Sequence, residues 1–221
     1  MAKDTKKEVS WYHTGEDADA ALEREVSRQK QAKEDAGKMR RYYLPAESKG
    51  KITFVDGNVH PKGFKLPFAI MEHNLKLNGH WRNWYTCIGK GCPLCEHGNK
   101  PYLATIYTVI DHNKWNDKQG GVHQDETRLF VAKTSVQRIL KAKAEKKGGL
   151  QGWKVEVTRV KSESPSTGDD FDFEERGVFD ISKTEIVDYR EIFAPKSLEE
   201  LKEIFSGGST AVEASDDEVQ Y

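Results

Sequence analysis

The sequence predicts a mainly β protein of the α+β class, on two observations. The first is a series of short stretches rich in β-branched and aromatic residues, separated by Gly, Asn and Asp at turn positions. The second is one helix-like segment, residues 134–147, which follows most of these stretches and precedes a final pair. A helix between the third and fourth core strands is typical of the OB fold, so we expect an OB-type Greek-key barrel.

The strands follow from alternation and turn residues. Residues 51–55 form the first and end at Asp56-Gly57, and residues 68–77 and 81–87 are joined by Asn78-Gly79, a hairpin signal. Later stretches of the same kind are residues 102–110, 126–132, 153–160 and 171–179. We expect the last two to pair antiparallel across residues 162–170.

Three helices are expected. In residues 134–147, Val136, Ile139 and Leu140 share one face, Thr134 can cap the start, and Gly148-Gly149 ends the segment. Residues 16–38 have helix-forming composition but few apolar side chains, which favours a polar, solvated N-terminal helix. Residues 198–205 form a short third helix.

Charge divides the chain into blocks. Residues 38–165 carry a net charge of +12, residues 166–221 carry −11 and residues 1–37 carry −2. A basic middle followed by an acidic end indicates a polyanion-binding surface with an acidic tail. We expect a polar arm at 1–37, an OB-type core at 38–183 with a zinc knuckle at about 73–97, a helical segment at 184–206 and a disordered acidic tail at 207–221.

The three cysteines of the chain lie within nine residues, as Cys87-x4-Cys92-x2-Cys95. An odd count cannot be fully paired in disulfides, and neither a signal peptide nor an apolar run long enough to span a membrane is visible, so we expect a reducing, cytoplasmic setting. Three clustered thiolates need one more ligand to form a closed tetrahedral Zn²⁺ site. The candidates are His73, His80 and His97, of which we favour His73, with His80 second.

Basic and aromatic residues lie next to one another in two places, Arg40-Arg41-Tyr42-Tyr43 and Trp81-Arg82-Asn83-Trp84-Tyr85. Cations meet the phosphates of a single strand, and rings stack on its bases. If 81–87 is a strand, only one of its faces can meet DNA, and we favour the face that carries Arg82 and Trp84. The residues expected to contact nucleic acid are Arg40, Arg41, Tyr43, Arg82, Trp84, Tyr107, Trp115 and Lys141. The rings expected in the core are Phe54, Phe68, Phe130 and Trp153.

The stretch Leu66-Pro-Phe-Ala-Ile70, His73, Asn78-Gly79, Trp81 and the three cysteines resembles the zinc-containing single-stranded-DNA-binding proteins of tailed bacteriophages. The resemblance implies an OB-type core with a zinc subdomain, a basic cleft and an acidic C-terminal tail. It also implies that His73, Cys87, Cys92 and Cys95 are the ligands. The first two cysteines are closer together here, and the N-terminal arm, basic in that family, is slightly acidic.

The expected function is non-enzymatic, sequence-nonspecific binding of single-stranded DNA during phage DNA replication, recombination and repair. Replication or recombination proteins are the expected partners of the acidic tail. Two alternatives are an HNH-like metal-dependent nuclease and a zinc-ribbon adaptor that binds protein alone. The chain has no Gly-x4-Gly-Lys-Ser/Thr phosphate loop, which argues against NTP-driven unwinding.

Overall fold

The computed structural model describes residues 15, 18–23, 26, 39–60, 63–77, 80–116 and 120–206, without the side chains of 59, 60, 77, 80–83, 205 and 206. The chain forms two compact units, residues 1–38 and residues 39–221. In the first unit, residues 18–23 are helical, and they lie within the predicted polar N-terminal helix. The predicted acidic tail at 207–221 lies outside the described residues.

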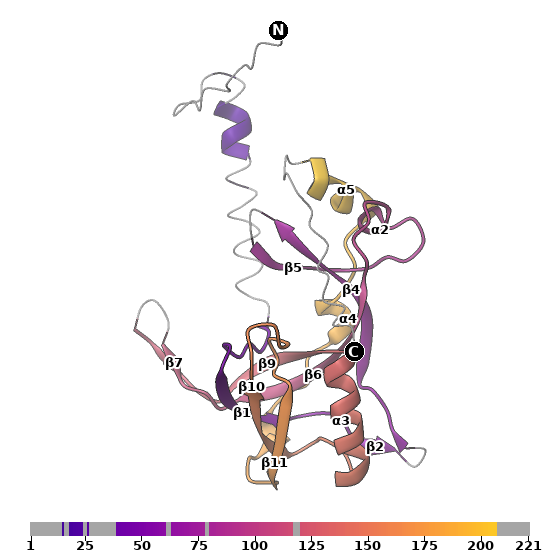
Figure 1. The fold of residues 1–221 in the computed structure, drawn as a ribbon. Coiled ribbons are helices and arrows are strands. Elements are labelled where there is room, and N and C mark those ends of the chain that lie inside the picture. The colour runs from indigo at the N-terminus through magenta and orange to yellow at the C-terminus, as the bar shows by residue number, and fades with distance from the viewer. Residues whose placement is uncertain are drawn as a thin grey trace. The chain divides into compact units, whose positions relative to one another are not determined.

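Seven strands form one antiparallel sheet, which confirms the mainly β class (Figure 1). In the described part of the second unit, two small hairpins and four α-helices accompany this sheet. The sheet holds β1 (Ser48–Phe54), β4 (Phe68–Leu77), β5 (His80–Thr86), β6 (Tyr102–Asp111), β9 (Glu126–Lys133), β10 (Trp153–Arg159) and β11 (Asp170–Arg176). The hairpins pair β2 (Val59–His60) with β3 (Gly63–Phe64), and β7 (Trp115–Asn116) with β8 (Val122–His123). The helices are α2 (Pro93–Glu96), α3 (Thr134–Lys147), α4 (Tyr189–Ile192) and α5 (Leu198–Ser206), with a 3-10 turn, η1 (Ile181–Lys183).

Strand β6 organises the sheet. One of its edges is shared by β4, along residues 102–106, and by β1, along 109–111, while β9 pairs with the other edge along 104–111. Residues 104–111 are all buried, as expected for a strand with neighbours on both edges and covered faces. Strands β10 and β11 extend the sheet beyond β1, and the predicted antiparallel pairing of the last two strands is confirmed.

Residues 40–44 occupy the second edge of β9. The Tyr42 N–H donates to the Leu129 carbonyl at 2.8 Å, and the Leu129 N–H donates to the Arg40 carbonyl at 3.0 Å. Further along, the Leu44 N–H donates to the Ser166 carbonyl at 2.8 Å. This segment therefore links β9 to the connection between β10 and β11 through backbone hydrogen bonds.

The main core lies between the sheet and α3. Val136, Leu140 and Ala144 of α3 belong to the same buried cluster as Tyr107 and Phe130. The helix ends as predicted, since Gly148 adopts a left-handed φ of 71° and its N–H donates to the Ala144 carbonyl. The start differs from the prediction: Lys133 occupies the N-cap position with no side-chain cap, and Thr134 is already the first helical residue.

The C-terminal segment packs on the sheet and on the β4–β5 hairpin. Tyr189 and Phe193 belong to a buried cluster with Ile106 and Leu129. Leu201 of α5 is completely buried, in a cluster that also contains Cys92. Residues 184–206, expected as a separate segment, therefore belong to the same compact unit as the core. Among the described residues, no helix has the length and apolar character needed to cross a membrane.

Candidate metal centre and nucleic-acid interface

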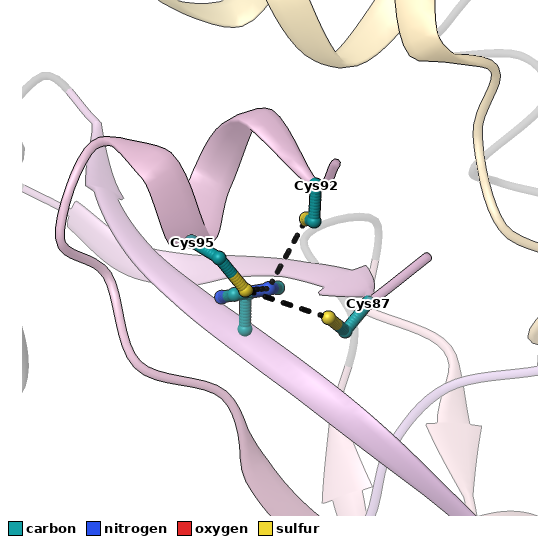
Figure 2. Close-up of side chains that lie close together, drawn as sticks. Cys87, Cys92 and Cys95 are labelled. Carbon is teal, nitrogen blue, oxygen red and sulfur yellow. Dashed lines mark hydrogen bonds between the residues drawn. The ribbon is translucent and has the colours of Figure 1, made fainter. Parts of the chain in front are cut away.

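One cluster of potential metal ligands combines residues from three elements. His73 lies on β4, Cys87 follows β5, Cys92 immediately precedes α2 and Cys95 lies within α2. The predicted hairpin brings the histidine and the first cysteine together, because β4 and β5 pair with His73 opposite Tyr85. Figure 2 shows the sulfur atoms of the three cysteines turned toward a common region.

Three of the six distances between the four ligand atoms match the edges of a tetrahedral zinc site. His73 Nε2 lies 3.5 Å from Cys92 Sγ and 3.6 Å from Cys95 Sγ, and the Sγ atoms of Cys87 and Cys95 are 3.7 Å apart. All four atoms lie within 4.8 Å of one another. Zinc bonds of about 2.3 Å to sulfur and about 2.0 Å to nitrogen give tetrahedral edges of roughly 3.5–3.8 Å. The cluster could therefore hold a metal ion.

Tight turns bring the cysteines together. Gly89 and Gly91 have φ of 78° and 75°, a conformation that side-chain-bearing residues rarely adopt. The Gly89 N–H donates to Cys87 Sγ at 3.4 Å, and the Cys92 N–H donates to the Gly89 carbonyl at 3.2 Å. Pro93 then begins α2 at a position where its missing N–H is not needed.

A second layer of hydrogen bonds fixes the histidine. The Nδ1–H of His73 donates to Asn99 Oδ1 at 2.8 Å, which leaves Nε2 facing the sulfur atoms with its lone pair. The Asn99 amide in turn donates to the Asn74 carbonyl at 3.2 Å. Both His73 and Asn99 are buried, so this orientation is held away from water.

The ionisation of the cluster favours a bound cation. Burial lowers the pKa of His73, which favours the neutral imidazole that a metal requires. Burial, together with the neighbouring thiol of Cys87, raises the pKa of Cys95 to about 12. At Cys92 burial acts in the same direction, but backbone N–H groups, that of Cys95 foremost, outweigh it and lower the pKa. Without a cation, the neighbouring thiols of Cys87 and Cys92 oppose the ionisation of Cys95.

Of the other two candidate histidines, His97 is not part of the described cluster. The Nδ1–H of His97 donates to the Pro93 carbonyl at 2.8 Å. The side chain of His80 lies outside the described residues. His73, the favoured candidate, is the histidine grouped with the three cysteines.

Asn99→Leu is expected to lower metal affinity about 10- to 100-fold, because the imidazole loses the partner that fixes its tautomer and ring orientation. The measurement is competition with a chromophoric chelator. Asn99→Asp is the comparison variant: its carboxylate can still accept from Nδ1–H, although it loses the donor to the Asn74 carbonyl, so it should retain more affinity than Asn99→Leu. Equal affinities for wild type and Asn99→Leu would remove Asn99 from the site.

A hollow of about 390 Å³ collects two of the predicted nucleic-acid contacts, Arg40 and Trp115. The guanidinium groups of Arg40 and Arg128 lie 5.2 and 5.4 Å from the centre of the Trp115 ring. His123 stacks on the same indole, with ring centres 4.2 Å apart and planes 12° apart. The indole N–H donates to Glu126 Oε2 at 3.1 Å. Arg128 and His123 each also contact the Glu126 carboxylate, so the half-buried ring is held between two guanidinium groups, an imidazole and one carboxylate.

Two other predicted contacts, Arg41 and Trp84, pack against each other. The Arg41 guanidinium lies 4.2 Å from the centre of the Trp84 ring and makes a two-pronged ion pair with Glu72. The Glu72 side chain is only 1% exposed and also accepts a hydrogen bond from Tyr102 Oη at 2.7 Å. The charge of Arg41 is thus matched by a buried carboxylate, which gives this arginine a structural role.

The remaining predicted contacts differ in their exposure to solvent. Tyr107 was expected to stack on DNA, but this is wrong: the residue is completely buried, and its Oη donates to Gln137 Oε1 at 2.7 Å. Tyr43 is 49% exposed beside the Arg159 guanidinium, and Lys141 is exposed on α3. The side chain of Arg82 lies outside the described residues.

The core assignments are confirmed for Phe54 and Phe130, which are fully buried, whereas Phe68 and Trp153 are only partly buried. Arg128 and His123 were not among the predicted contacts, although they lie against Trp115. Arg128 shares a face of β9 with Glu126, but nothing in the sequence places that face against Trp115.

Thr53, His112 and Asp125 form a hydrogen-bonded series in the order of a hydrolytic triad. Thr53 Oγ1 donates to His112 Nε2 at 2.8 Å, and His112 Nδ1–H donates to Asp125 Oδ1 at 2.5 Å. Thr53 is completely buried, so a substrate cannot approach its hydroxyl. The series instead ties β1 to the connection between β6 and β9.

Comparisons with known proteins found no matching family model, no matching curated protein and no matching solved structure.

Proposed function

We propose that this chain is a zinc-stabilised, non-enzymatic protein that binds single-stranded DNA without sequence preference. Its role would be to protect and organise the strand during phage DNA replication, recombination and repair, as the sequence resemblance implies. The observation that carries the proposal is the hollow around Trp115, where an aromatic ring lies among guanidinium groups. Rings that stack on bases and cations that meet phosphates are the two components of single-strand recognition.

The strand order supports an OB-type core as the scaffold. Strands β1, β6 and β9 pair in sequence, α3 follows β9, and β10 returns to pair with β1 before β11. This is the succession of three strands, a helix and two strands that is typical of the OB fold. Residues 40–44 bridge β9 and the β10–β11 connection, where a regular barrel would close by strand pairing. The β4–β5 hairpin and α2 are then an insertion between the first two strands.

The position of the hollow on this scaffold also supports the proposal. OB folds bind oligonucleotides on the face of their second and third strands and on the loops that join strands 1 and 2 and strands 4 and 5. Here the second and third strands are β6 and β9, and Glu126, Thr127 and Arg128 of β9 line the hollow. Trp115 and His123 belong to the hairpin that joins these two strands. Arg40 comes from the segment that runs along the far edge of β9.

Zinc is the ion that best fits the four-ligand cluster. Three thiolates and one imidazole in a closed tetrahedral set are the donors that structural Zn²⁺ prefers, whereas iron–sulfur clusters usually need four cysteines. Bound Zn²⁺ would neutralise the charge of the thiolates and cross-link the four ligands, and it would take no part in a reaction on DNA. His73, Cys87, Cys92 and Cys95 would hold it and thereby fix the β4–β5 hairpin to α2.

Trp115→Ala is expected to weaken binding of oligo-dT by about 5- to 100-fold, since one stacked base contributes roughly 1–3 kcal/mol. Fluorescence anisotropy of a labelled strand measures the affinity. Trp115→Phe is the matched control, because it keeps a ring for stacking and should retain most of the affinity.

Labelled oligo-dT should remain intact after incubation with the protein and Mg²⁺ or Mn²⁺. Its binding should weaken as the salt concentration rises. Cleavage would favour the nuclease alternative, and wild type that neither binds nor cuts DNA would favour the adaptor. Unchanged affinity in Trp115→Ala would remove the Trp115 hollow as the binding site.

A further inference from the structure

A second hollow, of about 510 Å³, is lined in part by residues that neighbour those of the first along the chain. Lys114 and Gln124 line it, whereas their chain neighbours Trp115 and His123 line the first hollow. The base of the β7–β8 hairpin therefore contributes to both hollows, and successive residues along it serve one or the other.

Lysine is the dominant side chain of this second hollow. Lys49 and Lys51 lie two residues apart on β1, so both point to the same face of the sheet at a spacing of about 7 Å. Lys154 lies on the paired strand β10, opposite Thr53. With Lys114, four ammonium groups line the hollow against one lining carboxylate, that of Glu156.

The floor beneath these lysines is rigid. The Lys51 N–H donates to Asn113 Oδ1 at 3.2 Å, and the His112 N–H donates to the Lys51 carbonyl at 2.9 Å. Asn113 is held in turn by Asp111, to which its Nδ2 donates at 2.6 Å. A side chain at Gly50 would lie 2.6 Å from Asn113 Nδ2, so glycine is what allows this close approach.

Four carboxylates lie near Lys49 and Lys51, those of Glu156, Asp170, Asp172 and Glu174, and only that of Glu156 lines the hollow. Lys49 pairs with Glu156 at 2.6 Å and Lys51 pairs with Glu174 at 2.5 Å, but the two lysine side chains are 64% and 43% exposed. Ion pairs this exposed are weak, so an ammonium group can exchange its carboxylate for a phosphate.

We propose that this hollow binds the sugar–phosphate backbone of the single strand whose bases stack at Trp115. The inference rests on the proposed function and assigns backbone binding and base stacking to two different hollows. The lysine hollow supplies charge and does not discriminate between bases, whereas the Trp115 hollow supplies ring contact. The bound DNA strand then crosses the base of the β7–β8 hairpin.

The test is the salt dependence of oligo-dT binding by a variant that carries Lys49→Gln, Lys51→Gln, Lys114→Gln and Lys154→Gln. Each lost phosphate contact reduces the slope of log K against log salt by about 0.7 for single strands, so the slope should become shallower by roughly 2–3. Lys196→Gln with Lys202→Gln is the matched control, since neither residue lines either hollow, and it should leave the slope unchanged.

Two further measurements separate the hollows. An abasic oligonucleotide retains the backbone but offers no base to stack, so the lysine variant should lose affinity for it, whereas Trp115→Ala should bind it like wild type. Glu156→Gln removes the one lining carboxylate and should tighten binding several-fold, a gain that misfolding cannot produce.

Wild type that binds oligo-dT, with an unchanged slope in the four-lysine variant and no gain in Glu156→Gln, would overturn the lysine hollow and leave the proposed function standing. Wild type that fails to bind oligo-dT at low salt would overturn the proposed function itself, and this inference with it.

Discussion

Cys92→Ser is expected to release the proposed zinc ion and to unfold one part of the molecule. Structural zinc contributes its binding free energy directly to folding, with apparent values of about 10–16 kcal/mol in zinc-finger peptides. Cys92 is 1% exposed and shares a buried cluster with Leu75, Leu94 and Leu201. Loss of the ion should therefore loosen α2 and, through Leu201, helix α5.

The core between the sheet and α3 should survive this change, because it forms a separate apolar cluster that contains none of these residues. Metal analysis should find about one zinc ion per wild-type chain and none in the variant. Hydrogen exchange should show lost protection in α2 and α5, with little change in β1, β6 and α3. Wild type stripped of metal by a chelator is the control and should lose protection in the same segments. A variant that retains its zinc would contradict the ligand set.

Local patterns in the sequence predict most of the regular elements. The bounds of β4 and α3 agree with the predicted ranges 68–77 and 134–147, because turn residues or glycines mark where the pattern ends. Contacts between distant segments leave no such pattern. The hydrogen bonds that place residues 40–44 beside Leu129 and Ser166 join backbones, and backbone groups carry no sequence signal.

The face of a strand that becomes buried is also not determined by local sequence patterns. Alternation places Tyr102 and Tyr107 on opposite faces of β6, but it does not say which face α3 covers. The structure places Tyr107 under α3, where it hydrogen bonds to Gln137 of that helix. Only the packing of the helix on the sheet decides that this ring is core, so the expected role in stacking could not be excluded from sequence.

The candidate metal site was predictable because its chemistry is local. Two cysteines separated by two residues can reach one ion by themselves, and the hairpin signal at Asn78-Gly79 explains how His73 joins them. Asn99 gives no comparable signal. Its role depends on a hydrogen bond to a residue 26 positions away. The lysine hollow was also missed, because Lys49, Lys51, Lys114 and Lys154 meet only when β1, β10 and the β6–β9 connection come together.

Two adjacent arginines that look equivalent in the sequence are expected to behave oppositely when replaced. Arg40 is exposed beside Trp115, whereas Arg41 pairs with Glu72, whose side chain is 1% exposed. Among the described residues, Arg41→Ala leaves that buried carboxylate with the hydroxyl of Tyr102 as its remaining side-chain hydrogen-bond donor. Removing one partner of a buried ion pair costs about 3–5 kcal/mol, and the 20% exposure of Arg41 places the expected loss at the lower end.

Urea unfolding of both variants measures this difference, with oligo-dT affinity measured beside it. Arg40→Ala should change the free energy of unfolding by no more than about 0.5 kcal/mol, as is usual for surface positions, and should weaken DNA binding. Arg41→Ala should be destabilised, and the double variant Arg41→Ala with Glu72→Gln should recover part of the loss, because no unpaired charge then remains buried. If Arg41→Ala instead kept full stability and lost DNA affinity, the guanidinium would be a DNA contact after all, and its ion pair with Glu72 would not persist in solution.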